Sequence, residues 1–222
     1  MKGKTLTATL DYVFLKGFIL DLAATIMQQK DDLNGLDAEC GDGDFGVGMY
    51  VAFQRVQQAA LTSIGKDVGA LLKDVGQAIL SSAGGASGPL FGTLFIEAGR
   101  AAEGRSEIDL AGLESLFRQA LQEIRERGGA RVGDKTLVDA LEPATLSLGE
   151  STRAGIDLPR ALEKAAEAAR LGSESTRRLI ARHGKARYLG EQTLGHEDPG
   201  AHVIAVLFQT LVDRYRAQSA PS

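Results

Sequence analysis

The stretch "DLAGLESLFRQALQEIRERGG" (residues 109–129) has the apolar spacing of an amphipathic helix. Asp109 can cap the start of this helix, and Gly128–Gly129 can end it. The sequence therefore predicts a helix over 109–127. Its large apolar residues recur at intervals of three and four, at Leu110, Leu113, Phe117, Leu121 and Ile124.

Similar spacing covers most of the chain on either side of this stretch. A last helix is predicted to begin at the cap and first-turn pair Asp198 and Pro199. Because there is no convincing alternation of period two, we expect an all-α fold of roughly eight helices. Residues 1–216 are expected to form one domain, and 217–222 a frayed tail. The other predicted helices cover 6–30, 47–61, 67–82, 88–103, 134–148 and 157–182.

The composition is that of an ordinary globular protein, with 44% hydrophobic and 24% charged residues among 222. A formal net charge of −4 gives no general attraction to nucleic acid or anionic membranes, so neither is expected as a partner. No apolar run approaches the roughly 20 residues of a membrane span, and the N-terminal segment does not read as a signal peptide. A single cysteine, Cys40, cannot form an internal disulfide, which favours a cytoplasmic protein.

Three aspartates, Asp37, Asp42 and Asp44, stand close together in the glycine-rich stretch "LNGLDAECGDGDFG" (33–46). A regular helix would point Asp37 and Asp42 about 140° apart, and a strand would put Asp37 opposite the other two. We therefore expect an irregular loop to bring the three together.

Converging carboxylates repel one another unless a cation lies between them. The spacing does not fit the calcium-binding EF-hand loop, whereas Mg²⁺ held by carboxylates and a phosphate group fits it. The alternative is a solvated acidic turn at the start of the next helix.

Two further segments could hold an anion. The small residues of "SSAGGASGPLFGTLF" (81–95) precede a helix start, where free N–H groups favour negative charge, although the segment is not a P-loop. A tight helix–helix connection is the favoured explanation of this segment taken alone. A basic segment follows later in the chain and could bind phosphate oxygens or form a solvated face. Its cations are Arg177, Arg178, Arg182, Lys185 and Arg187.

The segment "GDKTLVDALEP" (133–143) predicts a helix with Asp134 as its N-cap. Asp139 and Glu142 are expected at the surface or behind a site. The three histidines lack cysteines at zinc spacing, and Cys40 has no base beside it, so covalent catalysis is not expected.

Four segments taken together resemble the nucleotide-binding (L) subunit of dihydroxyacetone kinase. They are "LDAECGDGDFGVGM", "SSAGGASGPLFGT", "GDKTLVDALEPA" and "ARHGKARYLGEQTLGHEDPGA", and they occur in the family's order over nearly the whole chain. The resemblance implies an eight-helix antiparallel barrel with ADP or ATP at one end. It also implies two Mg²⁺ ions held by Asp37, Asp42 and Asp44. The nucleotide contacts that it implies are Phe45, Gly46, Val47, Gly48, Ala86, Ser87, Gly128, Leu137, Lys185, Asp198, Pro199 and Gly200.

The resemblance further implies a separate K subunit that holds dihydroxyacetone, or a related short ketose, through its own histidine. The phosphoryl group would come from ATP or, with ADP as a bound cofactor, from a phosphotransferase-system protein. A homodimer is compatible with the resemblance. Alternatives are a kinase subunit for another substrate such as a tetrose, and a nucleotide-loaded regulatory module without catalysis.

Two positions depart from the family pattern. Where many members carry a small or polar residue or a histidine, this chain has Phe45, so a phosphate contact there must use the backbone N–H. Lys185 stands where arginine is frequent, which replaces a bidentate clamp by a point charge. Neither departure changes a metal ligand, and no general base is assigned in this chain.

Overall fold

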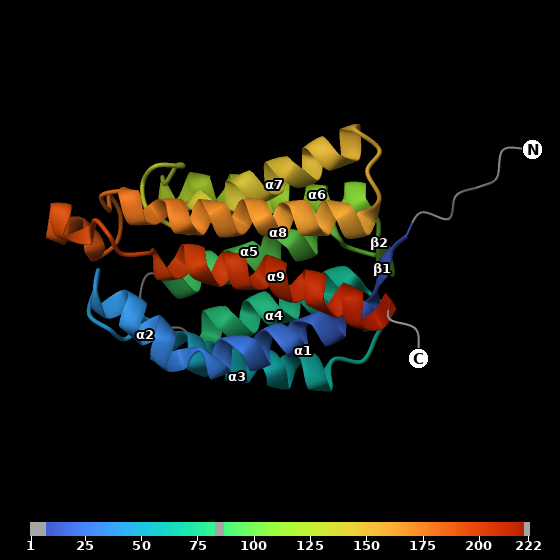
Figure 1. Ribbon diagram of the computed structural model, residues 1–222. Coiled ribbons are helices and arrows are strands. Elements are labelled where there is room, and N and C mark those ends of the chain that lie inside the picture. Colours follow the sequence, from blue (N-terminus) through green and yellow to red (C-terminus); the bar gives the residue numbers. More distant parts are fainter. Residues whose placement is uncertain (1–7, 83–86, 220–222) are drawn as a thin grey trace, which may run out of the picture.

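A computed structural model describes residues 8–82 and 87–219, and these ranges are mostly helical (Figure 1). The predicted all-α class is confirmed. The α-helices are α1 (Tyr12–Gln28), α2 (Lys30–Ala38), α3 (Phe45–Thr62), α4 (Val68–Ser82), α5 (Ser87–Ala101), α6 (Leu110–Gly128), α7 (Val138–Arg153), α8 (Leu158–Ser175) and α9 (Pro199–Ser219). Two 3₁₀ helices, η1 (Thr176–Arg178) and η2 (Ala186–Thr193), and two short strands, β1 (Leu10–Asp11) and β2 (Glu107–Ile108), complete the described elements.

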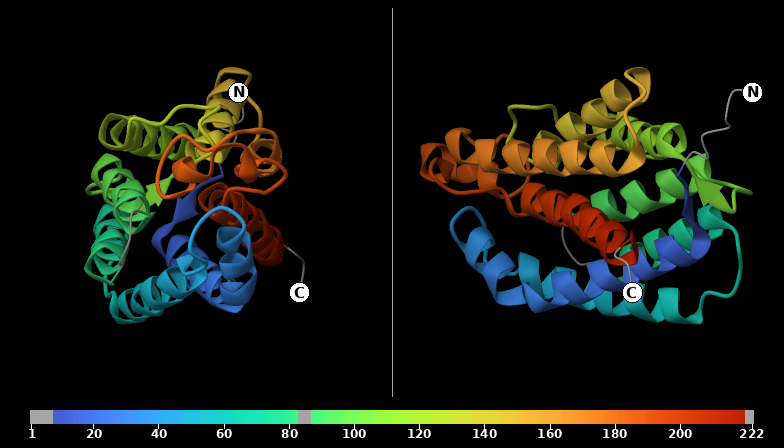
Figure 2. Two further views of the ribbon diagram at one scale, coloured as in Figure 1. Left: turned by 90° about the vertical axis from the view of Figure 1, so that its left-hand side faces the viewer. Right: turned by 45° about the vertical axis from the view of Figure 1, so that its right-hand side comes forward.

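The longer helices contact one another in chain order and close a ring. α1 packs on α3, each later helix packs on the next, and α9 returns to contact α1. The end-on view shows this ring (Figure 2, left). Large side chains that are fully buried, such as Phe53, Phe91 and Phe208, fill the space between the helices. The short helix α2 packs mainly on α3, at the end of the ring where η2 also lies (Figure 1).

Helix α6 has the predicted caps. The Asp109 carboxylate accepts a hydrogen bond of 2.8 Å from the N–H of Gly112, and Gly129 ends the helix with a left-handed φ of 70°. Its predicted apolar face is buried at Leu113, Phe117 and Ile124. The spacing of apolar residues therefore identified both the extent of this helix and the face that packs.

The N-terminal prediction is wrong in two respects. Within the described ranges the first helix begins at Tyr12, where the Asp11 carboxylate caps it, and Leu10–Asp11 pair with β2 in an antiparallel ladder instead of being helical. The predicted helix also stops early, because Gln29 separates α1 from α2. No helix was predicted over residues 31–38.

The prediction of a helix from Asp134 is also wrong at its start. The Asp134 carboxylate accepts from the N–H of Arg131 within a loop, and Lys135 has a φ of 60°, which an α-helix excludes. Helix α7 starts only at Val138 and continues to Arg153.

Two helix ends also differ from the prediction. Helix α8 ends at Ser175 instead of 182, where the 3₁₀ turn η1 takes over. Helix α9 extends to Ser219, into the segment 217–222 that was expected to be frayed. In the described part of the chain, no helix combines the length and the apolar character needed to cross a membrane.

Candidate metal and nucleotide site

Three carboxylates converge at the end of the ring that carries α2. Asp37 lies on the last turn of α2, Asp42 in the following loop, and Asp44 immediately before α3. One oxygen of each carboxylate lies within 4.8 Å of one oxygen of each of the others. The irregular loop that we expected is present over residues 39–44 and brings the three together, although Asp37 itself lies on the helix before it. We call Asp37, Asp42 and Asp44 the acid cluster.

Glycines and backbone hydrogen bonds hold this turn in place. Gly43 has a φ of 75°, which reverses the chain between Asp42 and Asp44. The Oδ2 atom of Asp37 accepts from the N–H groups of Asp44 at 3.0 Å and Phe45 at 3.2 Å. The α2 carboxylate thus fixes the start of α3.

Helices α2 and α3 approach each other at Gly46. A Cβ atom at this position would lie 2.0 Å from the carbonyl oxygen of Lys30, so only glycine permits the contact. One turn further along α2, the Oδ1 atom of Asn34 accepts from the N–H of Val47 at 3.0 Å. The spacing of the acid cluster therefore depends on how these two helices pack.

The electrostatics of the acid cluster favour a bound cation. Burial, together with the charge of Asp42, raises the pKa of the Asp37 carboxyl despite its backbone hydrogen bonds. The Lys185 ammonium group donates to the Asp42 carboxylate and lowers the pKa of Asp42. Oxygen ligands of this kind suit a hard divalent ion such as Mg²⁺, and Lys185 supplies a positive charge at the same carboxylate.

The first turn of α3 contains the predicted phosphate contacts Phe45, Gly46, Val47 and Gly48. Three of their N–H groups already donate within the protein: Phe45 to Asp37, Val47 to Asn34, and Gly48 to the carbonyl oxygen of Asp44 at 3.0 Å. A phosphate contact through the N–H of Phe45 would therefore compete with Asp37. The contact of this turn with a nucleotide stays a prediction.

A second group of predicted residues meets where α7 and α9 begin. A Cβ atom on Gly200 would lie 3.4 Å from the Cβ atom of Leu137. Asp198 caps α9, since its carboxylate accepts from the N–H of Ala201 at 2.7 Å, and Pro199 is buried in the first turn. Burial raises the pKa of the Asp198 carboxyl to about 7.

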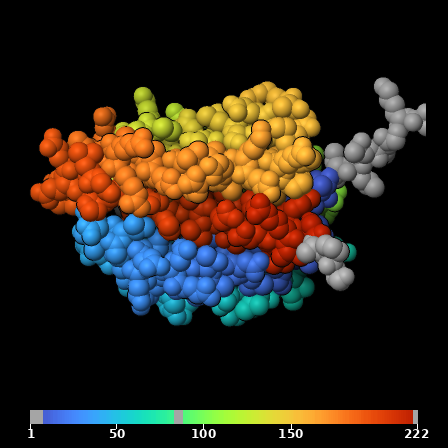
Figure 3. Space-filling model, viewed as in Figure 1, coloured from blue at the N-terminus to red at the C-terminus, as the bar shows by residue number. Residues whose placement is uncertain are grey.

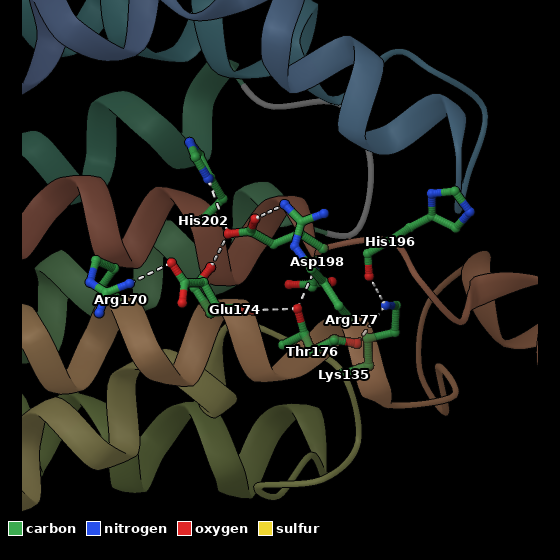
Figure 4. Close-up of polar contacts among 10 residues, drawn as sticks. Lys135, Arg170, Glu174, Thr176, Arg177, His196, Asp198 and His202 are labelled. Carbon is green, nitrogen blue, oxygen red and sulfur yellow. Dashed lines mark hydrogen bonds and ion pairs between the residues drawn. The ribbon is translucent and has the colours of Figure 1, made fainter.

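A buried lysine supports this second group (Figure 4). Lys135 is only 2% exposed, and its ammonium group donates to the carbonyl oxygens of Thr176, at 2.7 Å, and His196. The hydroxyl of Thr176 in turn accepts from the N–H of Asp198 at 2.9 Å. The loop before α7, the end of α8 and the segment before α9 are therefore tied together.

Glu197 lies beside this network and was not predicted. Its carboxylate accepts from Ser173 at 2.6 Å and Arg177 at 2.7 Å, and lies 3.2 Å from a ring nitrogen of His202. Burial opposes its ionisation, but these partners outweigh burial and lower the pKa of Glu197 to about 2. Its only sequence signal is its place inside the "GHEDPGA" run.

The remaining predicted residues lie apart from these groups or outside the described ranges. Gly128 ends α6, where a Cβ atom would lie 3.5 Å from Leu90 of α5. Ser87 begins α5, and Ala86 lies outside the described residues. Asp139 is buried behind the site and accepts from the N–H groups of Gly133 and Thr136. The structure thus joins Lys185 to the acid cluster and Leu137 to residues 198–200.

A family model for the DAK2 domain matches residues 39–213. The chain belongs to the DAK2 domain family. Among curated proteins of this kind, the "PEP-dependent dihydroxyacetone kinase, ADP-binding subunit DhaL" of Escherichia coli is 42% identical over 183 residues, which is 82% of this chain and 87% of that protein. "PEP-dependent dihydroxyacetone kinase 2, ADP-binding subunit DhaL" of Listeria innocua is 32% identical over 93% of this chain and 96% of its own length.

Part of a solved structure has the same architecture as this chain. It is the dihydroxyacetone kinase of C. freundii in complex with AMP-PNP and Mg²⁺, with a TM-score of 0.71 and 27% identity. The match covers 96% of this chain and 36% of that chain, so this chain spans about a third of that kinase. The family model's match begins two residues after Asp37, so the place of Asp37 in the acid cluster rests on the geometry described above.

Proposed function

We propose that this chain is the ADP-binding, Mg²⁺-dependent subunit of a two-component dihydroxyacetone kinase. The observation that carries the proposal is the convergence of three carboxylates within 4.8 Å, next to a lysine and at the start of a helix. The relatives named above as ADP-binding subunits, and the related kinase solved with AMP-PNP and Mg²⁺, support a nucleotide and a metal as the ligands.

The residues of the chain have distinct roles in this proposal. Asp37, Asp42 and Asp44 would hold Mg²⁺, which when bound neutralises negative charge on the transferred phosphoryl group. The ammonium of Lys185 can bind a phosphate oxygen as a point charge. The other predicted nucleotide contacts lie on the first turns of α3 and α9, at the start of α7, and at Gly128 and Ser87.

The substrate would be held elsewhere. We assign no nucleophile or general base in this chain and propose that a partner, the K subunit, positions the ketose hydroxyl. Since the relatives of E. coli and L. innocua are named PEP-dependent, we further propose that ADP stays bound and is rephosphorylated by a phosphotransferase-system donor protein. A cytoplasmic location follows from these partners.

Reconstitution tests the proposed function. The purified chain is mixed with a K subunit, dihydroxyacetone and Mg²⁺, and supplied with either ATP or the phosphorylated donor protein. Ketose phosphate should form with the donor protein, and Asp42→Asn should abolish it. Turnover with freely exchanging ATP would support the other phosphoryl source, and equal turnover by Asp42→Asn would contradict the metal role of the acid cluster.

A further inference from the structure

Lys185 is the cation that the described part of the chain brings into contact with the acid cluster. Its ammonium group donates to the Asp42 carboxylate, although 143 positions separate the two residues. One oxygen of each of the three carboxylates lies within 4.8 Å of one oxygen of each of the others. A positive charge at Asp42 therefore offsets the repulsion within the whole cluster and not only the charge of one carboxylate.

The fold holds Lys185 in this place from the opposite side of the site. The segment 176–198 that carries it lies beside α2 at the same end of the molecule (Figure 3). Gly184, with a φ of 62°, turns the chain immediately before Lys185. The Lys135 ammonium bonds Thr176 and His196, which lie near the two ends of the segment.

The ion pair is open to solvent, so its partners can exchange. The side chain of Lys185 is 67% exposed and that of Asp42 is 47% exposed. An ammonium group and a divalent ion at the same carboxylate compete, because both need its oxygen atoms. Phosphate oxygens offer Lys185 another anionic partner, and a bound nucleotide would present them at this end of the molecule.

From this geometry, and resting on the proposed function, we propose that Lys185 is the internal counter-ion of the acid cluster. Nucleotide phosphates draw Lys185 away from Asp42, so that metal ions bind the cluster well only together with the nucleotide. Coupling between two ligands is reciprocal, so Lys185 also strengthens nucleotide binding through the metal. The coupling acts through the exchange of partners at Lys185, from the Asp42 carboxylate to a phosphate oxygen, and so goes beyond a phosphate contact alone.

Removing Lys185 should raise the Mn²⁺ affinity of the nucleotide-free protein and lower its ADP affinity in the presence of Mn²⁺. These opposite changes make the proposal testable. Mn²⁺ is titrated into the nucleotide-free protein and into its ADP complex, and free Mn²⁺ is measured by electron paramagnetic resonance. Lys185→Met should bind Mn²⁺ about two- to fivefold more tightly than the wild type without ADP, as expected for an exposed ion pair. It should bind ADP more weakly in the presence of Mn²⁺, so the ratio of the Mn²⁺ affinities with and without ADP should fall.

Two variants control for charge. Lys185→Arg keeps the counter-ion and should resemble the wild type in nucleotide-free Mn²⁺ binding. Arg187→Met removes one positive charge from the same segment, but the Arg187 guanidinium lies over the Tyr188 ring and not on the acid cluster. It should raise Mn²⁺ affinity far less than Lys185→Met does.

Different results would contradict the role of Lys185 and the proposed function. The role of Lys185 alone would be overturned if nucleotide-free Lys185→Met bound Mn²⁺ no more tightly than the wild type. It would also be overturned if Arg187→Met gained as much Mn²⁺ affinity as Lys185→Met. Failure of the wild-type ADP complex to bind Mn²⁺ at all would instead contradict the proposed function, on which this role depends.

Discussion

The buried ammonium group of Lys135 donates a hydrogen bond of 2.7 Å to the carbonyl oxygen of Thr176, across 41 positions of sequence. The same group donates to the carbonyl oxygen of His196. Burial lowers the pKa of Lys135, and the nearby acidic groups of Cys40 and Asp198 oppose this shift. Lys135 thus connects the loop before α7 to both ends of the segment that carries Lys185, and it does so without touching the acid cluster.

Replacing Lys135 should loosen this segment. Lys135→Met leaves two carbonyl groups without their charged donor, and we expect the free energy of unfolding to fall by about 2 kcal/mol. ADP affinity should fall as well, because Lys185 and Asp198 lose their support. Urea unfolding and calorimetric titration measure the two effects. Lys164→Met, on the exposed face of α8, is the matched control, and an equal loss there would contradict this role of Lys135.

The contacts of Lys135 also show which features could not be predicted from the sequence. Helix α6 and the caps at Asp109 and Asp198 were predicted, because periodicity and capping are local properties. A bond between Lys135 and Thr176 depends on how distant segments pack, which the sequence alone does not specify. Residues 134–137 were assigned to a helix because Asp134 is a good cap in isolation, whereas a φ of 60° at Lys135 requires a loop.

Helix α2 was missed for a different reason. The segment "KDDLNGLDA" (30–38) buries only Leu33, so it lacks the repeated apolar face that the prediction relied on. Packing against α3 at Gly46 stabilises it instead. The three aspartates of the acid cluster were therefore predicted from their chemistry, but helix α2, which carries Asp37, was not predicted.

Gly46 should be intolerant of a side chain. In Gly46→Ala the new Cβ atom would meet the Lys30 carbonyl oxygen at 2.0 Å, so α2 must move away from α3. We expect the free energy of unfolding to fall by about 1–3 kcal/mol. In Gly35→Ala, on α2, a Cβ atom meets nothing within 4 Å, and stability should be unchanged or raised by about 0.5–1 kcal/mol. Thermal unfolding of both variants measures the difference, and a stable Gly46→Ala protein would contradict the close contact.

Replacing Asp37 should destabilise the protein more than replacing Asp42. Asp37 accepts two backbone N–H groups at the start of α3, whereas Asp42 is exposed and paired with Lys185. Asp37→Ala should therefore lower the free energy of unfolding by about 1 kcal/mol in metal-free buffer. Asp42→Ala should leave the melting temperature close to that of the wild type. Both should lose Mn²⁺ binding in the presence of ADP. Equal thermal stability of the two variants would contradict the structural role of Asp37.

Glu197 should make stability depend on pH below neutrality. Its pKa is about 2 in the folded protein and 4.5 in its ordinary state, so the unfolded chain takes up the proton first as pH falls. The stability that Glu197 provides is therefore complete above pH 4.5 and is lost as pH falls towards 2. Between pH 7 and pH 3, the wild type should lose about 1–2 kcal/mol more than Glu197→Gln, in urea titrations at each pH. If the wild type and Glu197→Gln lost the same free energy of unfolding over this range, the partners of Glu197 would not lower its pKa.

Binding of ADP by the nucleotide-stripped chain, measured by calorimetry with Mg²⁺ and again with EDTA, tests the role of the acid cluster most directly. We predict that the wild type binds ADP in Mg²⁺ and loses this binding in EDTA. Asp42→Asn, which keeps the shape of the side chain, should weaken binding at least about tenfold in Mg²⁺. Equal ADP affinity with and without the metal, or in the wild type and Asp42→Asn, would contradict the account.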